Sequence, residues 1–284
     1  TNQACANAIA VSGPDVFVAG YENSSGVPVA KYWKNGVASS LTIGGAQPAI
    51  LGGIAVSDGN VYAAGYESNG SKRVAKYWKN GTGVALTDGT TDAWAAALAL
   101  SGTNVHIVGY EETAGGVRVA MYWKNGVRIP LTDGTRQAHA TAIAVSGERV
   151  LIAGNERYGT KMAGKNWKIW PTGTVISATD ASTDADISAA WIDGEVAIVA
   201  GYETGAATGK MVAKYWVDGT PVVLSDGIWS ADVRGIARIA GVVYAAGYQY
   251  DGTNTIALLW KNGTMLPISS SGSPTRVWAM QVVP

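Results

Sequence analysis

The feature that most constrains this chain is a sequence unit that occurs six times. The tripeptide Gly-Tyr-Glu, or a close variant, recurs at steps of 44 to 47 residues, and a tryptophan that ends Val-Ala-Lys-Tyr-Trp or a looser form of it recurs in step. Two markers with one period predict six copies of one structural unit. The glycines are Gly20, Gly65, Gly109, Gly154, Gly201 and Gly247, and the tryptophans are Trp33, Trp78, Trp123, Trp167, Trp216 and Trp260.

Each copy contains four short segments of β-strand character with no helical periodicity between them. The first is small and apolar, as at 8–11, and the second reads Val-Tyr-Ala-Ala-Gly-Tyr-Glu at 61–67. The third ends in Trp-Lys-Asn-Gly, as at 33–36, where Asn-Gly supplies the two positive φ angles of a tight hairpin turn. A fourth strand follows, as at 84–87. Six units of four antiparallel strands predict an all-β fold, the six-bladed β-propeller.

The sizes of the side chains agree with this arrangement. The first strand of each unit is rich in Ala and Gly, which suits crowded strands around an axis, and the third strand carries Tyr and Trp. We expect the six repeated tryptophans to be buried between blades, because they supply much of the large aromatic surface that can fill those gaps.

The repeat predicts a single domain over 1–284. Its blades are expected at about 3–44, 45–89, 90–134, 135–181, 182–227 and 228–270, with an extra segment like an innermost strand at 276–284. The innermost-strand pattern therefore occurs seven times. Residues 3–13 match 137–147 at all but two positions, so we predict that the N-terminal copy fills the first blade. Because one place in the first blade cannot hold both terminal copies, either one copy is displaced or one chain lends a strand to another, which would build dimers or fibres.

Charge and composition exclude several classes of protein. Lys and Arg number 21, as do Asp and Glu, and no run of basic residues occurs, which argues against nucleic acid and anionic membranes as partners. The single cysteine, Cys5, excludes an intramolecular disulfide and a thiolate zinc site. The apolar runs are too short to span a bilayer. We expect a soluble protein from which any export signal has been removed.

Three segments carry a resemblance: Val-Tyr-Ala-Ala-Gly-Tyr-Glu, Ala-Lys-Tyr-Trp-Lys-Asn-Gly and Leu-Thr-Asp-Gly-Thr. They resemble the repeats of secreted or surface six-bladed propellers of bacteria, over nearly the whole chain. The resemblance implies the propeller fold and an extracellular or cell-surface location, and it brings no catalytic residues. In size and blade number the chain is also similar to six-bladed fucose-binding lectins. It lacks the Trp-Asp dipeptide, the kelch Gly-Gly pair and the sialidase box of other propeller families.

One face of the predicted propeller varies between copies, which makes it the candidate binding face. It carries the connections between second and third strands and those that lead into each first strand, and we call it the upper face. Its candidate binding residues are Trp94, His139, Asp186, Trp229 and Arg276.

The repeated glutamates form a second candidate set on this face, namely Glu22, Glu67, Glu111, Glu156 and Glu203. Strand alternation places Lys31, Lys76, Lys165 and Lys214 on the same sheet face as four of them, whereas the third repeat has Met121 there. One interpretation is an ion pair held between blades. The other is a sugar-binding set of Glu, Lys and Trp.

Enzyme motifs are missing. No nucleophile motif accompanies His106 or His139, and the single aspartates at 88, 133 and 226 suit Asp-Gly turns better than calcium sites. We predict no catalytic residue, no metal and no cofactor, and therefore not an enzyme, although a hydrolase or lyase on the upper face stays open. The predicted function is an extracellular binding or surface-display module for carbohydrate or protein. The alternative is a structural subunit that self-associates.

Overall fold

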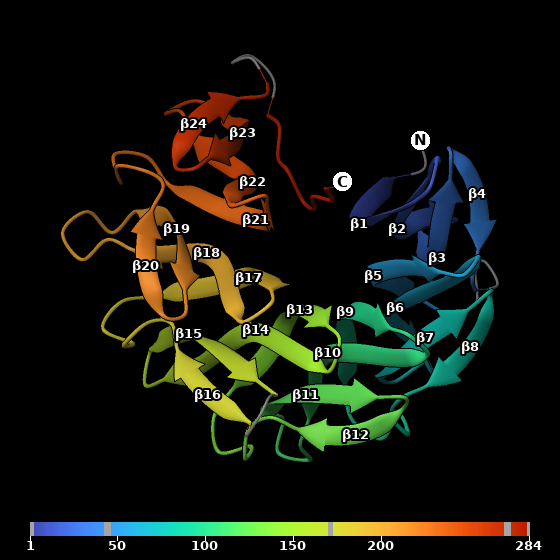
Figure 1. The fold of residues 1–284 in the computed structure, drawn as a ribbon. Helices are drawn as coiled ribbons and strands as arrows, with labels where there is room; N and C mark the ends of the chain where they lie inside the picture. The colour runs from blue at the N-terminus through green and yellow to red at the C-terminus, as the bar shows by residue number, and fades with distance from the viewer. Residues whose placement is uncertain (1–2, 43–46, 170–172, 270–273, 283–284) are drawn as a thin grey trace. The chain divides into compact units, whose positions relative to one another are not determined.

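The computed structural model describes residues 3–42, 47–169, 173–269 and 274–282. These residues form strands β1 to β24 and no helix, so this part of the chain contains no helix that could span a membrane (Figure 1). The strands make six antiparallel sheets of four, each in the order of the chain. The predicted all-β class and six-bladed β-propeller are confirmed.

The chain forms two compact units, 1–140 and 141–284, and each is described by itself. In the first, blade 1 holds β1 (Ala4–Ser12), β2 (Asp15–Ser24), β3 (Val27–Lys34) and β4 (Val37–Ser40). Blade 2 holds β5 (Ala49–Ser57), β6 (Asn60–Ser68), β7 (Arg73–Lys79) and β8 (Thr82–Ala85), and blade 3 holds β9 (Ala93–Ser101), β10 (Asn104–Glu112), β11 (Arg118–Lys124) and β12 (Val127–Pro130).

The boundary between the units falls inside β13 (Ala138–Ser146), which belongs to blade 4 with β14 (Arg149–Tyr158), β15 (Lys161–Lys168) and β16 (Thr174–Ser177). Blade 5 holds β17 (Ala185–Asp193), β18 (Val196–Thr204), β19 (Met211–Val217) and β20 (Thr220–Val223). Blade 6 holds β21 (Ala231–Ile239), β22 (Val242–Tyr250), β23 (Thr255–Lys261) and β24 (Thr264–Pro267). That the whole chain is one domain stays a prediction, and parts of the predicted blade boundaries, such as 44/45 and 270, lie outside the described residues.

The Asn-Gly turns have the predicted left-handed backbone. In blade 1, Asn35 has a φ of 49° and Gly36 a φ of 83°, and blades 2, 3 and 6 repeat the pattern. The asparagine has a second role, because its side-chain oxygen accepts a hydrogen bond from the second strand, with Val16 N to Asn35 Oδ1 at 2.9 Å. The same contact occurs from Val61 to Asn80. These bonds explain why the turn residue is asparagine and why Asn-Gly recurs in the repeat.

A bulge in the innermost strand explains the repeated glycine of Gly-Tyr-Glu. The pairing of first and second strands shifts by one residue in blades 1, 2, 3, 5 and 6. At the shift, the first strand presses a carbonyl group against the glycine of the second strand. A Cβ atom at Gly109 would lie 2.9 Å from the carbonyl carbon of Trp94 and closer still to its oxygen. No side chain fits there, so the position must be glycine.

The bulged residue also ties neighbouring blades together. Asn7, the extra residue of β1, donates from Nδ2 to the carbonyl oxygen of Leu51 in β5 at 2.8 Å. Ser188 in β17 donates in the same way to the carbonyl of Val233 in β21. Each bond satisfies the carbonyl of a buried residue, and a buried carbonyl without a partner would cost roughly 1–3 kcal/mol.

The cores lie between consecutive blades, where small residues face large ones. Ala19 and Ala30 of blade 1 pack in one cluster with Trp78 of blade 2. The clusters between blades 2 and 3, 4 and 5, and 5 and 6 are built in the same way around Trp123, Trp216 and Trp260. Five of the six repeated tryptophans, the fifth being Trp167, are buried as predicted. Trp33 is the exception, since it is only partly buried.

The two terminal copies of the innermost strand differ. The N-terminal copy pairs with β2 from Ala4 opposite Glu22 to Ser12 opposite Asp15, so the prediction that it fills the first blade is confirmed. The C-terminal copy was expected to be a strand, but residues 274–282 contain none, and 283–284 lie outside the described residues. Met280 nevertheless lies against Gly235 of β21, as Ala97 lies against Gly53 of β5. The segment occupies the place of a following first strand without strand pairing.

The bulge yields a prediction about stability. Gly109→Ala should lower the free energy of unfolding by roughly 3 kcal/mol, because the added methyl group overlaps backbone that cannot move. Gly126→Ala is the matched control, since Gly126 has a φ of +82° but open space around it, and should cost only about 1 kcal/mol. Urea denaturation measures both. Equal losses of unfolding free energy in the two variants would show that the close approach of the carbonyl is not the reason why position 109 requires glycine.

Candidate functional site

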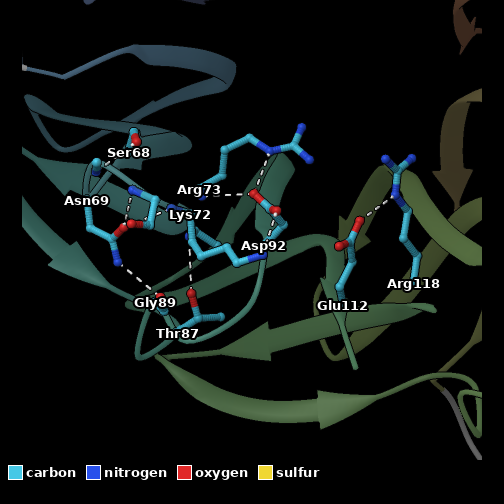
Figure 2. Close-up of polar contacts among 12 residues, drawn as sticks. Ser68, Asn69, Lys72, Arg73, Thr87, Gly89, Asp92, Glu112 and Arg118 are labelled. Atoms are coloured by element: carbon cyan, nitrogen blue, oxygen red, sulfur yellow. Dashed lines mark hydrogen bonds and ion pairs between the residues drawn. The ribbon is translucent and has the colours of Figure 1, made fainter. Parts of the chain in front are cut away.

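The loops of each unit meet at one end of the sheets, which we call the upper edge and which corresponds to the predicted upper face. The segment between second and third strands contacts the segment that leads into the next first strand, as where Asn69 Nδ2 donates to the carbonyl of Gly89 at 3.0 Å (Figure 2). The third strand opens with a capped N–H group. Arg73 N donates to Asp92 Oδ1 at 3.0 Å, and Arg118 N donates to Gln137 Oε1 at 2.9 Å.

At the upper edge of blades 2 and 3, aromatic and arginine side chains alternate. We call Tyr66, Arg73, Trp94, Tyr110 and Arg118 the arginine–aromatic cluster. The rings of Trp94 and Tyr66 lie 5.1 Å apart at 44°. The guanidinium carbon of Arg73 lies 6.0 Å from the centre of the Tyr66 ring and 5.8 Å from that of Tyr110, and the carbon of Arg118 lies 4.5 Å from Tyr110. Of the predicted candidate residues on the upper face, Trp94 is thus the one that belongs to this cluster.

Two carboxylates hold the arginines of this cluster in place. Arg73 Nε lies 3.1 Å from Asp92 Oδ1, and Arg118 Nε lies 3.3 Å from Glu112 Oε1 (Figure 2). Lys72 Nζ adds a third cation 3.6 Å from Asp92 Oδ2. Burial alone would raise the pKa of Asp92, but the hydrogen bonds from Arg73 outweigh it and lower that pKa below its ordinary value. The carboxylate is therefore ionised at neutral pH, and the aromatic and charged groups are fixed before any ligand arrives.

The tyrosines of the cluster are kept neutral. Burial raises the pKa of Tyr66 and of Tyr110, although Arg73 lowers both in part. Their hydroxyl groups therefore remain able to donate as well as accept hydrogen bonds over the physiological pH range.

The repeated glutamates are ion-paired as alternation predicts. The Glu–Lys distances are 2.5 Å in blade 1, 2.5 Å in blade 2, 3.8 Å in blade 4 and 2.6 Å in blade 5. In blade 3, where Met121 replaces the lysine, Arg128 of β12 pairs with Glu111 at 2.6 Å instead. These contacts agree with the ion-pair interpretation. A sugar-binding role for the glutamates stays a prediction.

The second unit has a separate group of polar residues at its upper edge. Asp186 accepts a hydrogen bond from Asn155, and one repeat later the side chain of Asp232 is only 1% exposed. Arg234 Nη2 lies 2.6 Å from Asp232 Oδ2, and the Tyr248 hydroxyl lies 3.3 Å from the same oxygen. Sequence reasoning missed Asp232, although its distance from Asp186 equals the repeat length and would have identified it.

Burial determines the ionisation of Asp232. It raises the pKa of this carboxyl group to about 6, which the positive charge of Arg234 counteracts and the negative charge of Asp186 reinforces. The pKa of Tyr202 rises to about 12, first because the hydroxyl is buried and then because both aspartates lie near it. This group is therefore a buried carboxyl with an arginine partner, unlike the accessible cluster of the first unit.

Of the remaining predicted residues, Arg276 joins the group around Asp232 through Tyr248, whereas Trp229 and His139 lie apart from it. Arg276 places its guanidinium 5.2 Å from the Tyr248 ring, and Trp229, 39% exposed, meets the Tyr250 ring edge-on at 6.0 Å. His139 lies partly buried in β13. His106 is buried, with Nδ1 2.7 Å from the Tyr122 hydroxyl. In the described part of the chain no three His, Cys, Asp or Glu side chains gather so as to hold a metal ion.

Comparison with known proteins gives the fold alone. No protein-family model matches the sequence, and no curated protein matches it. The solved structure of YjhT is 9% identical, with a TM-score of 0.50 over 90% of this chain and 96% of that one. A puromycin-hydrolyzing peptidase of Mycobacterium tuberculosis is 13% identical, with a TM-score of 0.58 over 95% of this chain and 49% of that one. An acylaminoacyl peptidase of Pyrococcus horikoshii is 12% identical, with a TM-score of 0.58 over 95% and 46%.

These similarities correct one prediction. The sequence predicted that the protein is not an enzyme, yet two of the structures that share its fold are those of peptidases, so that exclusion is wrong and an enzymatic role is possible. The chain spans about half the length of each peptidase. At such identities a shared fold does not carry an activity with it.

The buried carboxyl of Asp232 yields a prediction about pH. Its folded-state pKa of about 6 exceeds the ordinary 3.8, so the folded state binds this proton more tightly. The protonated Asp232 carboxyl group therefore adds roughly 3 kcal/mol to the free energy of unfolding below about pH 4, and this contribution is lost as the pH rises through about 6. Asp232→Asn should remove that part of the decline when unfolding is followed in urea at several pH values. A variant with the wild-type pH profile would show that Asp232 does not titrate in this range.

Proposed function

We propose that the protein is an extracellular or cell-surface binding module that takes carbohydrate at the upper edge of blades 2 and 3. The observation that carries this proposal is the half-buried indole of Trp94, packed on Tyr66, whose ring also lies 6.0 Å from the guanidinium carbon of Arg73. A sugar ring has an apolar C–H face and a rim of hydroxyl groups. The apolar C–H face can stack on an indole, and the hydroxyl groups can form hydrogen bonds with fixed guanidinium and carboxylate groups.

The extracellular location rests on the resemblance of the repeats to secreted or surface propellers of bacteria. The layout of the site supports a binding role as well. Few polar groups converge on an aromatic surface, and their positions are fixed by the ion pairs to Asp92 and Glu112, which lowers the entropy lost on binding.

The prediction is that Trp94→Ala loses carbohydrate binding. Removal of a stacking indole should weaken the best glycan on an array by about 100-fold, on the order of 3 kcal/mol. Trp278→Ala, which removes an indole that is 49% exposed in the second unit, is the matched control and should bind as the wild type does. Absence of any glycan ligand for the wild type, or equal binding by both variants, would contradict the proposal.

A second candidate function is assembly with further copies of the chain, and a groove on blade 1 favours it. The groove has a volume of about 430 Å³ and is lined by apolar residues that include Cys5, Val16, Val18 and Trp33. Trp78, the equivalent of Trp33 in blade 2, is buried against blade 1. Within the first unit, the equivalent surface of blade 2 packs on blade 1, and the assembly hypothesis is that a blade of a second copy of the chain packs on the surface around Trp33 in the same way.

The assembly hypothesis predicts an oligomer that depends on Trp33. Trp33→Glu should shift the protein to the monomer in native mass spectrometry, because a charge would be buried in an apolar contact. Val37→Glu is the control, since Val37 is 71% exposed in β4, and should leave the oligomer intact. A wild-type protein that is monomeric at micromolar concentration would contradict this function without affecting the carbohydrate proposal.

A further inference from the structure

Two arginines of the arginine–aromatic cluster share one tyrosine ring. The guanidinium carbons of Arg73 and Arg118 lie 5.8 and 4.5 Å from the centre of the Tyr110 ring. Two positive charges around one ring repel each other, and the ring face and the carboxylates of Asp92 and Glu112 offset that repulsion. The site therefore holds both guanidinium groups within about 6 Å of one ring centre, each supported by a carboxylate.

Each of the two guanidinium groups is held by a carboxylate through its own Nε atom. The ion pairs to Asp92 and Glu112 run through Nε, where the dashed lines of Figure 2 meet the two side chains. The side chains of Arg73 and Arg118 are 34% and 41% exposed. Within the described part of the chain, the side-chain hydrogen bonds of both arginines run through Nε. The terminal nitrogens form the planar fork that binds carboxylate, sulfate or phosphate oxygens in pairs.

This pair is particular to blades 2 and 3. Arg73 and Arg118 are the first residues of β7 and β11, whereas β15, β19 and β23 begin with Lys161, Met211 and Thr255. The fold does not need an arginine there, because the N–H group of Met211 is capped from the next first strand all the same, by Ser230. A structural role in the repeat therefore does not account for the two arginines.

The balance of charge favours an anion. Lys72, Arg73 and Arg118 supply three positive charges against the two carboxylates of Asp92 and Glu112, so the cluster has a net positive charge, although the whole chain has none. We infer that the ligand of this site is an acidic saccharide, whose carboxylate or sulfate group is bound by Arg73 and Arg118 while its ring stacks on Trp94. This inference rests on the proposed carbohydrate function.

The test compares saccharides that differ only in charge. The first pair of probes is trigalacturonic acid and its methyl ester, and the second is a sulfated galactose oligosaccharide and its desulfated form. Titration calorimetry should show that one acidic form binds at least about tenfold more tightly than its neutral counterpart, because charge-assisted pairs are the stronger hydrogen bonds. Arg73→Gln and Arg118→Gln should each remove most of this preference, measured within each variant as the ratio of its affinities for the acidic and the neutral form. The pair that responds identifies carboxylate or sulfate as the bound group.

Two further variants separate this role from a structural one. Arg73→Lys keeps the charge but loses the planar fork, so it should recover only part of the preference. Lys161→Gln, at the equivalent place in blade 4 and also paired with an aspartate, should change nothing. Thermal melts of all variants establish that they are folded.

The outcomes separate the inference from the function on which it rests. Equal binding of acidic and neutral forms, or a preference that survives both Arg→Gln changes, overturns the inference and leaves carbohydrate binding in place. Failure of both acidic probes to bind also overturns it. The glycan array with Trp94→Ala decides the proposed function separately.

Discussion

The close approach of a carbonyl in the innermost strand to a glycine in the second strand is the constraint on which the rest of each blade depends. It recurs at Gly20, Gly65, Gly109, Gly201 and Gly247. The bulge beside it sends one side chain across to the next blade, as Asn7 and Ser188 show. The residue that provides the carbonyl has its backbone fixed, whereas its side chain projects at the upper edge. That residue is Trp94 in blade 3, Asp186 in blade 5 and Asp232 in blade 6. The repeat thus holds one backbone position constant and leaves its side chain free to change.

Features that depend on neighbours in one hairpin could be predicted from the sequence. The turn conformation follows from Asn-Gly itself, and the ion pairs follow from strand alternation, since Glu22 and Lys31 are only nine residues apart. Even the exception in blade 3 is local, because Arg128 lies on the strand beside Met121 and reaches the same carboxylate.

Features that depend on contact between blades could not be predicted in this way. Arg73 meets Asp92 across 19 residues, and Tyr66 meets Trp94 from another sheet. Alternation fixes which face of a sheet a side chain occupies, but the distance and rotation between sheets are set by the packing of whole blades. The burial of Asp232 and the exposure of Trp33 have the same origin, because each depends on what covers a blade rather than on the blade itself.

Two aspartates show how burial by a neighbouring blade changes the pKa of a carboxyl group. Asp92 and Asp232 each have an arginine at hydrogen-bond distance, yet the pKa of Asp92 falls and that of Asp232 rises. The difference lies in solvation. Asp92 is 23% exposed and keeps part of its hydration, so the hydrogen bonds from Arg73 outweigh the cost of burial. Asp232 is 1% exposed, and the loss of water outweighs the attraction of Arg234. A ligand that approached Asp232 would first have to displace what covers it, whereas the terminal nitrogens beside Asp92 already face solvent. For this reason we propose the upper edge of blades 2 and 3, rather than the buried carboxyl of blade 6, as a place where a molecule can bind without rearrangement of the protein.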